Sequence, residues 1–140
     1  MLKSMRMASL MAALGIAVSG GLAMAQSTAR VEFEAGNDNA AVDGKVTGDE
    51  YVDYLLGAKA GQAMGVSLIV NSSDGNGTVY FNILPPGSSG EAIYNSSSEG
   101  TDAVNVPLPA DGDYTIRVYQ MGNDEDTGKT SSYTISVMIM

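Results

Sequence analysis

Carboxylates are the side chains of this sequence with the greatest capacity for chemistry. The chain has 16 Asp and Glu residues but no Cys and no His. It therefore has no thiol nucleophile, no Ser-His-Asp triad, no imidazole base and no zinc site of the usual nitrogen and sulfur ligands. Two carboxylates can hydrolyse a glycoside, but only when they face each other across a cleft and one has a raised pKa. Here the acids fall in predicted turns and on exposed strand faces, so we expect no enzyme activity.

Oxygen ligands suited to calcium occur in the turn Asp74-Gly75-Asn76 and in the run from Asn123 to Gly128. The second run resembles the start of a calcium-binding loop. However, its Gly lies two places beyond the second Asp, and no Glu follows at the bidentate position. This signal is weak, and we expect neither a metal nor another cofactor.

Arg117 is an isolated cation in the middle of a strongly alternating stretch. Two roles are open for it. Its guanidinium group could bond to a carboxylate of a partner, or it could pair with an acid on the neighbouring strand. The second role is the more common one for a cation on a sheet surface.

The tyrosines divide into two groups by their place in the alternating pattern. An aromatic side chain with a polar tip suits an interface, whereas a tyrosine in phase with aliphatic residues suits a core. We expect partial exposure for Tyr51, Tyr94 and Tyr119, and burial for Tyr54, Tyr114 and Tyr133.

Apolar residues alternate with polar ones along most of the chain, and no stretch has the period of an amphipathic helix. Turn residues separate these stretches, notably in 71–77, 85–90 and 109–112. The pattern predicts an all-β fold, an antiparallel β-sandwich or flattened barrel of about eight strands. The expected strands cover 31–33, 41–46, 51–58, 64–70, 79–83, 92–94, 104–108, 114–119 and 133–139.

The first 25 residues have the features of a secretory signal. Lys3 and Arg6 precede an apolar run over 7–18, which is too short to span a bilayer, and Ala23-Met24-Ala25 is a small-x-small cleavage site. We expect cleavage after Ala25 and a single domain over 26–140, without membrane insertion once the signal is removed.

The predicted mature chain is strongly acidic. Removal of the two cations in the signal from the total of 7 leaves 5 Lys and Arg against 16 Asp and Glu, a formal charge of −11. This balance argues against a nucleic-acid binder, which needs clustered cations for phosphates. It favours a basic macromolecular partner, although acidity can also serve solubility alone.

Short motifs spread over the predicted mature chain resemble those of one family. From Leu108 onward the match has almost no gaps. The motifs are Val31-Glu32-Phe33, Gly48 with Glu50-Tyr51, Ala58-Lys59-Ala60-Gly61-Gln62, Leu108-Pro109-Ala110, Gly112, Tyr114, Arg117-Val118, Gln120, Asn123-Asp124, Lys129-Thr130 and Tyr133. In these residues the chain resembles the periplasmic inhibitors of goose-type (g-type) lysozyme.

This resemblance implies an antiparallel β-sandwich that plugs the substrate cleft of a lysozyme with side chains from its loops. The family pattern has an aromatic residue after the glycine that matches Gly48, and arginines at the positions of Gly122 and Asp126. The partner-binding residues expected from the resemblance and the exposed positions are Asp49, Tyr51, Ser89, Arg117, Tyr119, Gly122, Asn123 and Asp126.

We therefore expect a periplasmic or secreted protein that inhibits a basic protein such as a lysozyme and binds no nucleic acid. The alternative is an accessory or cell-envelope binding module without inhibitory activity. One structural feature separates the two. Convergence of the loops at 48–51, 85–94 and 122–130 at one end of the fold would favour a plug.

Overall fold

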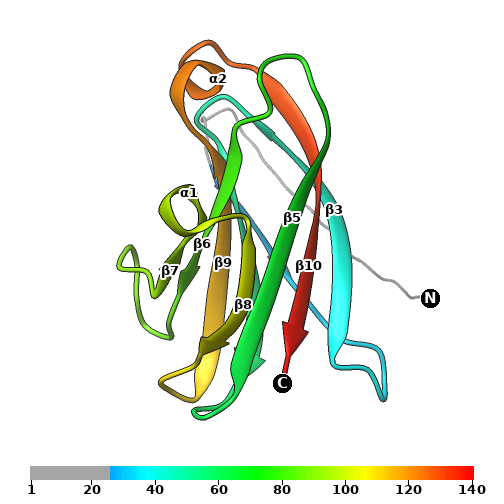
Figure 1. The fold of residues 1–140 in the computed structure, drawn as a ribbon, viewed down its shortest axis with the longest axis vertical. Helices are drawn as coiled ribbons and strands as arrows, with labels where there is room; N and C mark the ends of the chain where they lie inside the picture. Colours follow the sequence, from blue (N-terminus) through cyan, green and yellow to red (C-terminus); the bar gives the residue numbers. More distant parts are fainter. Residues whose placement is uncertain (1–25) are drawn as a thin grey trace, which may run out of the picture.

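Two packed β-sheets and two short helices make up residues 26–140, the part of the chain that the computed structural model describes (Figure 1). The predicted signal, residues 1–25, lies outside the described residues. In chain order the elements are β2 (Gln26–Arg30), β3 (Asn39–Thr47), β4 (Tyr51–Ala58), β5 (Ala63–Ser73), β6 (Val79–Leu84), β7 (Tyr94–Asn95), α1 (Ser96–Glu99), β8 (Asp102–Pro107), β9 (Gly112–Gln120), α2 (Gly122–Asp126) and β10 (Thr130–Ile139).

One sheet has four strands in the order β3-β10-β5-β8, and the other has five in the order β2-β4-β9-β6-β7. Among the described strands, the pairing of β2 with β4 is parallel and all other pairings are antiparallel. Side chains from the inner faces of both sheets form one core, as in other sandwiches. The predicted all-β sandwich is confirmed, with nine strands where about eight were expected.

The strands with the clearest alternation supply the centre of the core. Tyr114, Ile116 and Val118 on β9 are fully buried, and so are Tyr133 and Ile135 on β10. Their alternate neighbours point outward, because successive side chains of a strand lie on opposite faces of its sheet. These core assignments agree with the sequence pattern.

Tyr54 and Tyr133 join the two sheets through their hydroxyl groups, which lie 2.7 Å apart. Burial raises the pKa of both tyrosines, so the pair is neutral. Gly44 on β3 makes room for them, since a Cβ there would lie 2.6 Å from each hydroxyl oxygen. The predicted burial of Tyr54 and Tyr133 is confirmed, and that of Tyr114 as well.

The β8 strand departs from simple alternation. Val104 is 74% exposed, whereas Ala103 and Val106 are buried. A β-bulge lies between these two buried residues, where the register against β5 shifts and Asn105 has a φ of 55°. The extra residue in a bulge reverses the inward and outward phases of a strand. Val104 and Val106, two places apart in the predicted strand 104–108, therefore lie on opposite faces of the sheet.

Two expectations are wrong. The first strand is Gln26–Arg30 instead of 31–33. Val31 follows the last residue of β2; its backbone N–H still donates to Leu55 O on β4 at 2.8 Å, and its side chain enters the core. Tyr94 is 9% exposed, because its ring stacks on Phe81 and its hydroxyl donates to Gly100 O at 2.6 Å.

Within residues 26–140, none of the helices has the length and apolar character needed to cross a membrane.

Candidate functional site

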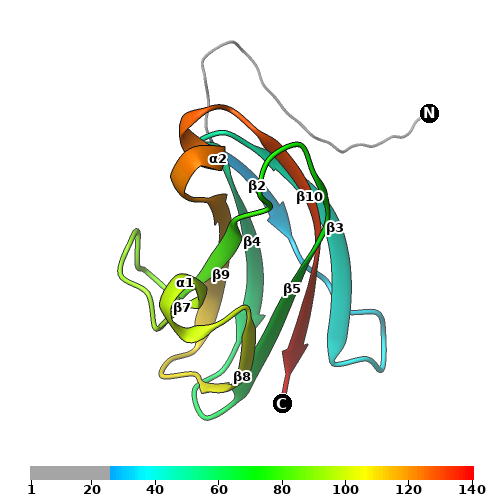
Figure 2. The same cartoon turned by 45° about the horizontal axis from the view of Figure 1, so that its top comes forward.

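Three connections that are far apart in the sequence meet at the end of the sandwich that carries α2 (Figures 1 and 2). Backbone bonds join them. The N–H of Gly48 donates to Lys129 O at 2.8 Å, and the N–H of Met121 donates to Thr78 O at 3.2 Å. We call this region the α2 end, which comprises residues 47–50, 73–78 and 121–130.

Asp124 is a buried carboxylate that fastens the β5–β6 connection to α2. Its Oδ2 accepts hydrogen bonds from the backbone N of Thr78 at 3.0 Å and from Thr78 Oγ1 at 2.7 Å. Its Oδ1 accepts from the backbone N of Asn76 at 2.9 Å. These hydrogen bonds hold the pKa of Asp124 below its ordinary value of 3.8. The bond from the Thr78 backbone has the largest effect on this pKa, and the bond from the Asn76 backbone has the second largest. A charged group thus orders two loops at once.

Gln120, at the end of β9, is a second buried polar residue that fixes the α2 end. Its Nε2 donates to Lys129 O at 2.8 Å, and its Oε1 accepts from Ser131 Oγ at 2.7 Å. Lys129 O, just before β10, also accepts the N–H of Gly48, so the β3–β4 turn and the Gln120 side chain share one acceptor. The loops of this end are therefore held by interior hydrogen bonds.

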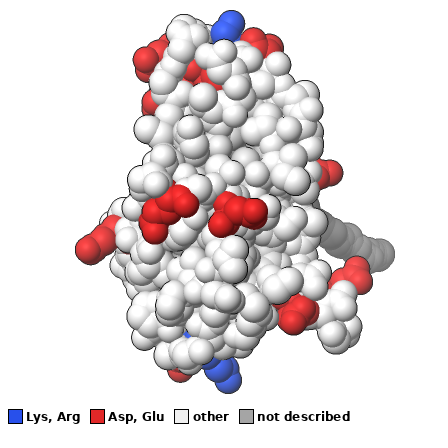
Figure 3. All heavy atoms as spheres, in the orientation of Figure 1, with Lys and Arg blue, Asp and Glu red and all other residues white. Residues whose placement is uncertain are grey.

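The surface of the α2 end is polar and mainly acidic. Figure 3 shows several Asp and Glu groups around one cationic group at the end where α2 lies. Asp49 lies in the β3–β4 turn, and Gly122, Asn123 and Asp126 belong to α2; all four are exposed. The structure thus brings together four of the eight sequence-predicted binding residues.

Three others lie nearby, on the outer face of the five-stranded sheet. Tyr51 on β4 pairs in register with Tyr119 on β9. Asp53 and Arg117 form the next pair of these strands on the same face. Tyr51 and Tyr119 are partly exposed, as predicted. Tyr119 donates its hydroxyl to Asn82 Oδ1 at 3.0 Å. These side chains form a partly exposed aromatic surface that continues from the α2 end.

Arg117 pairs with an acid on the neighbouring strand, one of the two roles left open by the sequence. Its Nε lies 2.8 Å from Asp53 Oδ1 and its Nη2 lies 3.0 Å from Oδ2, a two-pronged ion pair. The hydrogen bond to Asp53 raises the pKa of Arg117. The guanidinium carbon also lies 4.4 Å from the centre of the Tyr51 ring. Arg117 therefore orders this surface, and a contact with a partner stays a prediction.

Ser89 lies apart from the α2 end. Its loop follows β6, whose last residue, Leu84, pairs with Thr115 towards the other end of β9. The Ser89 carbonyl oxygen is 3.5 Å from Arg117 Nη1, a long contact that brings this loop beside the outer sheet face. Two of the three predicted loops therefore converge at one end, and the third flanks the aromatic surface.

The weak calcium pattern has another explanation in the structure. The turn at Asn76 does approach Asp124, as a calcium site would require. However, the Asp124 carboxylate accepts bonds from backbone N–H groups. Among residues 26–140, no group of three or more acidic side chains could hold a metal ion.

Sequence reasoning missed Asp53, Gln120 and Thr78 as residues that shape this region. The signal for Asp53 was present, since a single acid within the apolar run 51–58 needs a buried partner. No local signal identifies Gln120 or Thr78, because their partners come from other connections.

Comparison with known proteins gives a consistent set of relatives. The inhibitor of g-type lysozyme from Escherichia coli (strain K12) is 33% identical over 139 residues, 99% of this chain and 98% of that protein. The crystal structure of PliG, a periplasmic inhibitor of g-type lysozyme from Aeromonas hydrophila, matches with a TM-score of 0.70 and 33% identity, over 82% of this chain and 97% of that one.

The Salmonella Typhimurium PliG structure matches with a TM-score of 0.63 and 27% identity, over 81% of this chain and 98% of that one. No protein-family model matches the sequence.

Proposed function

The chain belongs to the family of inhibitors of g-type lysozyme, and from this premise we propose that it blocks the substrate cleft of such an enzyme with its α2 end. The protein is periplasmic, as the Aeromonas and Salmonella inhibitors are. Its relatives are inhibitors, and we infer that this chain also acts by binding and not by catalysis.

The observation that carries the proposal is the construction of the α2 end. A plug must enter a cleft without losing its shape, since ordering of a loose loop would cost binding free energy. Asp124 and Gln120 order these loops from inside, through buried hydrogen bonds. Their exposed neighbours, Asp49, Asn123 and Asp126, are left free to meet the enzyme.

Charge supports a basic lysozyme as the partner. With the predicted signal removed, 16 acidic residues face 5 basic ones. Such an excess steers a basic enzyme towards the inhibitor and raises the association rate more than the affinity. Tyr51 and Tyr119 would add partly exposed aromatic area beside the plug, where such side chains contribute most to binding.

A panel of enzymes tests the proposal. Residues 26–140 would be incubated with goose-type, chicken-type and invertebrate-type lysozymes, and residual cell-wall lysis would be measured for each. We expect loss of lysis with the goose-type enzyme. A folded domain that leaves all three enzymes fully active would support the accessory-module alternative instead.

A further inference from the structure

Lys129 is the single lysine of the α2 end, which contains no arginine. The acidic residues of the same three segments are Asp49, Glu50, Asp74, Asp124, Glu125 and Asp126. Figure 3 shows this contrast, with one cationic group among acidic ones at this end of the molecule. The contacts around Lys129 show whether its charge is used within the protein.

The backbone of Lys129 is held by hydrogen bonds to three other parts of the fold. Its N–H donates to Asp124 O in α2 at 3.0 Å. Its carbonyl oxygen accepts from the N–H of Gly48 at 2.8 Å and from Gln120 Nε2 at 2.8 Å. Because α2, the β3–β4 turn and the end of β9 all bind this one residue, its place at the α2 end is fixed.

The side-chain stem of Lys129 lies against the β5–β6 connection. A Cβ added to Gly75 would lie 2.7 Å from Lys129 Cγ, so the missing side chain of Gly75 leaves room for the stem. A lysine often packs its methylene groups along a surface while its ammonium group stays in water. This contact restricts the stem before any partner binds, which lowers the entropy lost on binding.

The ammonium group of Lys129 forms no ion pair within residues 26–140, since both ion pairs there lie on the five-stranded sheet. Two carboxylates of the α2 end accept backbone N–H groups instead. Asp124 accepts from Asn76 and Thr78, and Asp74 Oδ1 accepts from the backbone N of Thr130 at 2.8 Å. The ammonium group of Lys129 is therefore available to a carboxylate of another molecule.

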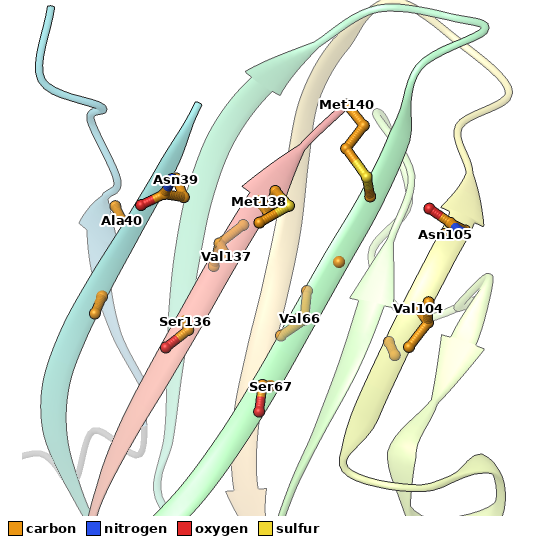
Figure 4. Close-up of a pocket in the computed structure, with 13 residues that line it drawn as sticks. Asn39, Ala40, Val66, Ser67, Val104, Asn105, Ser136, Val137, Met138 and Met140 are labelled. Atoms are coloured by element: carbon orange, nitrogen blue, oxygen red, sulfur yellow. The ribbon is translucent and has the colours of Figure 1, made fainter. Parts of the chain in front are cut away.

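A groove on the outer face of the four-stranded sheet offers no comparable group (Figure 4). It has a volume of about 530 Å³, and its lining comes from β3, β5, β8, β10 and Met140. No lysine or arginine is among the lining residues. This groove thus gives a carboxylate no ionic contact, whereas the α2 end does.

We propose that Lys129 binds a catalytic carboxylate in the cleft of the lysozyme, an inference that rests on the proposed function. Glycoside hydrolases typically hold two Asp or Glu side chains at the bond that they cleave. An acidic plug would be repelled by these groups unless a cation met them first. A charge-assisted hydrogen bond from the Lys129 ammonium group makes that contact attractive.

Net charge and local contact predict opposite effects when Lys129 is neutralised. Lys129→Met keeps the stem without the charge, so the acidic excess of the chain grows. Steering alone would then speed association with a basic enzyme. Loss of a bond to a cleft carboxylate would instead weaken the complex. A weaker complex therefore cannot result from a change in steering.

Calorimetric titration of goose-type lysozyme with residues 26–140 tests this proposal. Lys129→Met should raise the dissociation constant at least about tenfold. Lys129→Arg keeps the charge and should stay within about threefold of the parent. Lys59→Met removes the same charge from the exposed turn between β4 and β5, at the opposite end of the sandwich, and should bind like the parent. Melting curves should show that all three variants fold.

Lysozyme variants in which each catalytic carboxylate is replaced in turn by its amide complete a double-mutant cycle. Against one of these two enzymes, Lys129→Met and the parent should bind equally, because the bond is already absent.

Three outcomes would overturn the role of Lys129 and leave the proposed function standing. They are parent-like binding by Lys129→Met, an equal loss in Lys59→Met, and an undiminished loss in Lys129→Met against both amide enzymes. A parent chain that binds no goose-type lysozyme would overturn the proposed function itself, and the role of Lys129 with it.

Discussion

At the scale of single residues, Asp124 shows how a charge can be structural without a cationic partner. Its carboxylate accepts hydrogen bonds from Thr78 and Asn76, which hold its pKa below 3.8. A group whose pKa is lowered by folding stabilises the protein above its unfolded-state pKa, and this contribution is lost as the pH falls through the folded-state pKa. The stability due to Asp124 should therefore be complete at neutral pH and decline below about pH 4.

The substitution Asp124→Asn tests this role. The amide offers only one acceptor oxygen and places N–H donors against the donors of the β5–β6 connection. We expect the melting temperature to fall by several degrees at pH 7, with the difference from the parent shrinking as the pH is lowered to 3. Asp126→Asn, in the same helix but exposed, is the matched control and should melt like the parent. Equal stability of Asp124→Asn and the control would disprove the role of this carboxylate.

Asp53 and Arg117 form a pair that is largely withdrawn from water, with side-chain exposures of 6% and 24%. Removal of one partner from such a pair leaves the other buried without compensation. Arg117→Ala should cost about 2 kcal/mol in free energy of unfolding. Asp53→Ala/Arg117→Ala should cost less than the sum of the single changes.

Urea unfolding measures these differences, and the exposed pair of Arg30 and Asp113 provides the control. Its side chains are 44% and 55% exposed, so Arg30→Ala should cost at most about 0.5 kcal/mol. Equal losses for Arg117→Ala and Arg30→Ala would show that burial of the Asp53 pair adds nothing.

At the scale of elements, the sequence predicted those features that depend on neighbouring residues and missed those that depend on contacts between distant parts of the chain. The strands at 51–58 and 114–119 were predicted almost to the residue, because alternation and turn residues determine them locally. The bulge at Asn105 and the short helix α2 were not predicted. The bulge depends on the pairing of β8 with β5, and α2 on bonds from Asp124 to residues 46 and 48 positions earlier.

The candidate site followed the same rule. The partial exposure of Tyr51 and Tyr119 could be inferred from strand phase alone, and so could a pairing of Arg117 with some acid on a neighbouring strand. The identity of that acid, Asp53, depends on the pairing of β4 with β9 and was not predicted. The convergence of the β3–β4 and β9–β10 connections could not be inferred in this way, since it depends on how the two sheets pack. The position of Ser89 away from the α2 end could not be inferred either. It depends on the pairing of β6 with β9, which places Leu84, the last residue of β6, opposite Thr115 near the start of β9.

The α2 segment also gives a prediction about charge. The family resemblance implies arginines at the positions that Gly122 and Asp126 occupy in this chain. Gly122 has a φ of +69°, a left-handed conformation in which an arginine would be strained. Asp126 is exposed on α2. We expect Asp126→Arg to inhibit a goose-type lysozyme about fivefold to tenfold more strongly, through a charge-assisted bond to a cleft carboxylate.

Inhibition constants from a cell-wall lysis assay measure this gain. Glu32→Arg makes the same charge change on an exposed residue between β2 and β3, and it should not strengthen inhibition. If both variants inhibited no better than the parent while remaining folded, the α2 segment would not face the cleft of the enzyme.

At the scale of the whole molecule, the acidic excess should set how fast the complex forms. Screening limits the field of surface charges to about 8 Å at physiological ionic strength. The association rate with a basic lysozyme should therefore fall steeply as salt rises, while the dissociation rate changes much less. Stopped-flow or surface-binding kinetics at several salt concentrations would measure both. An association rate independent of salt would rule out electrostatic steering.

Hydrogen exchange tests most directly the central claim, that the α2 end is the surface that meets the lysozyme. Backbone amides of residues 26–140 would be followed with and without a saturating amount of goose-type enzyme. We predict new protection at 47–50, 73–78 and 121–129, and unchanged exchange on the outer face of the four-stranded sheet. Protection confined to that face, or a bound complex whose α2 end exchanges as fast as in the free protein, would contradict the claim.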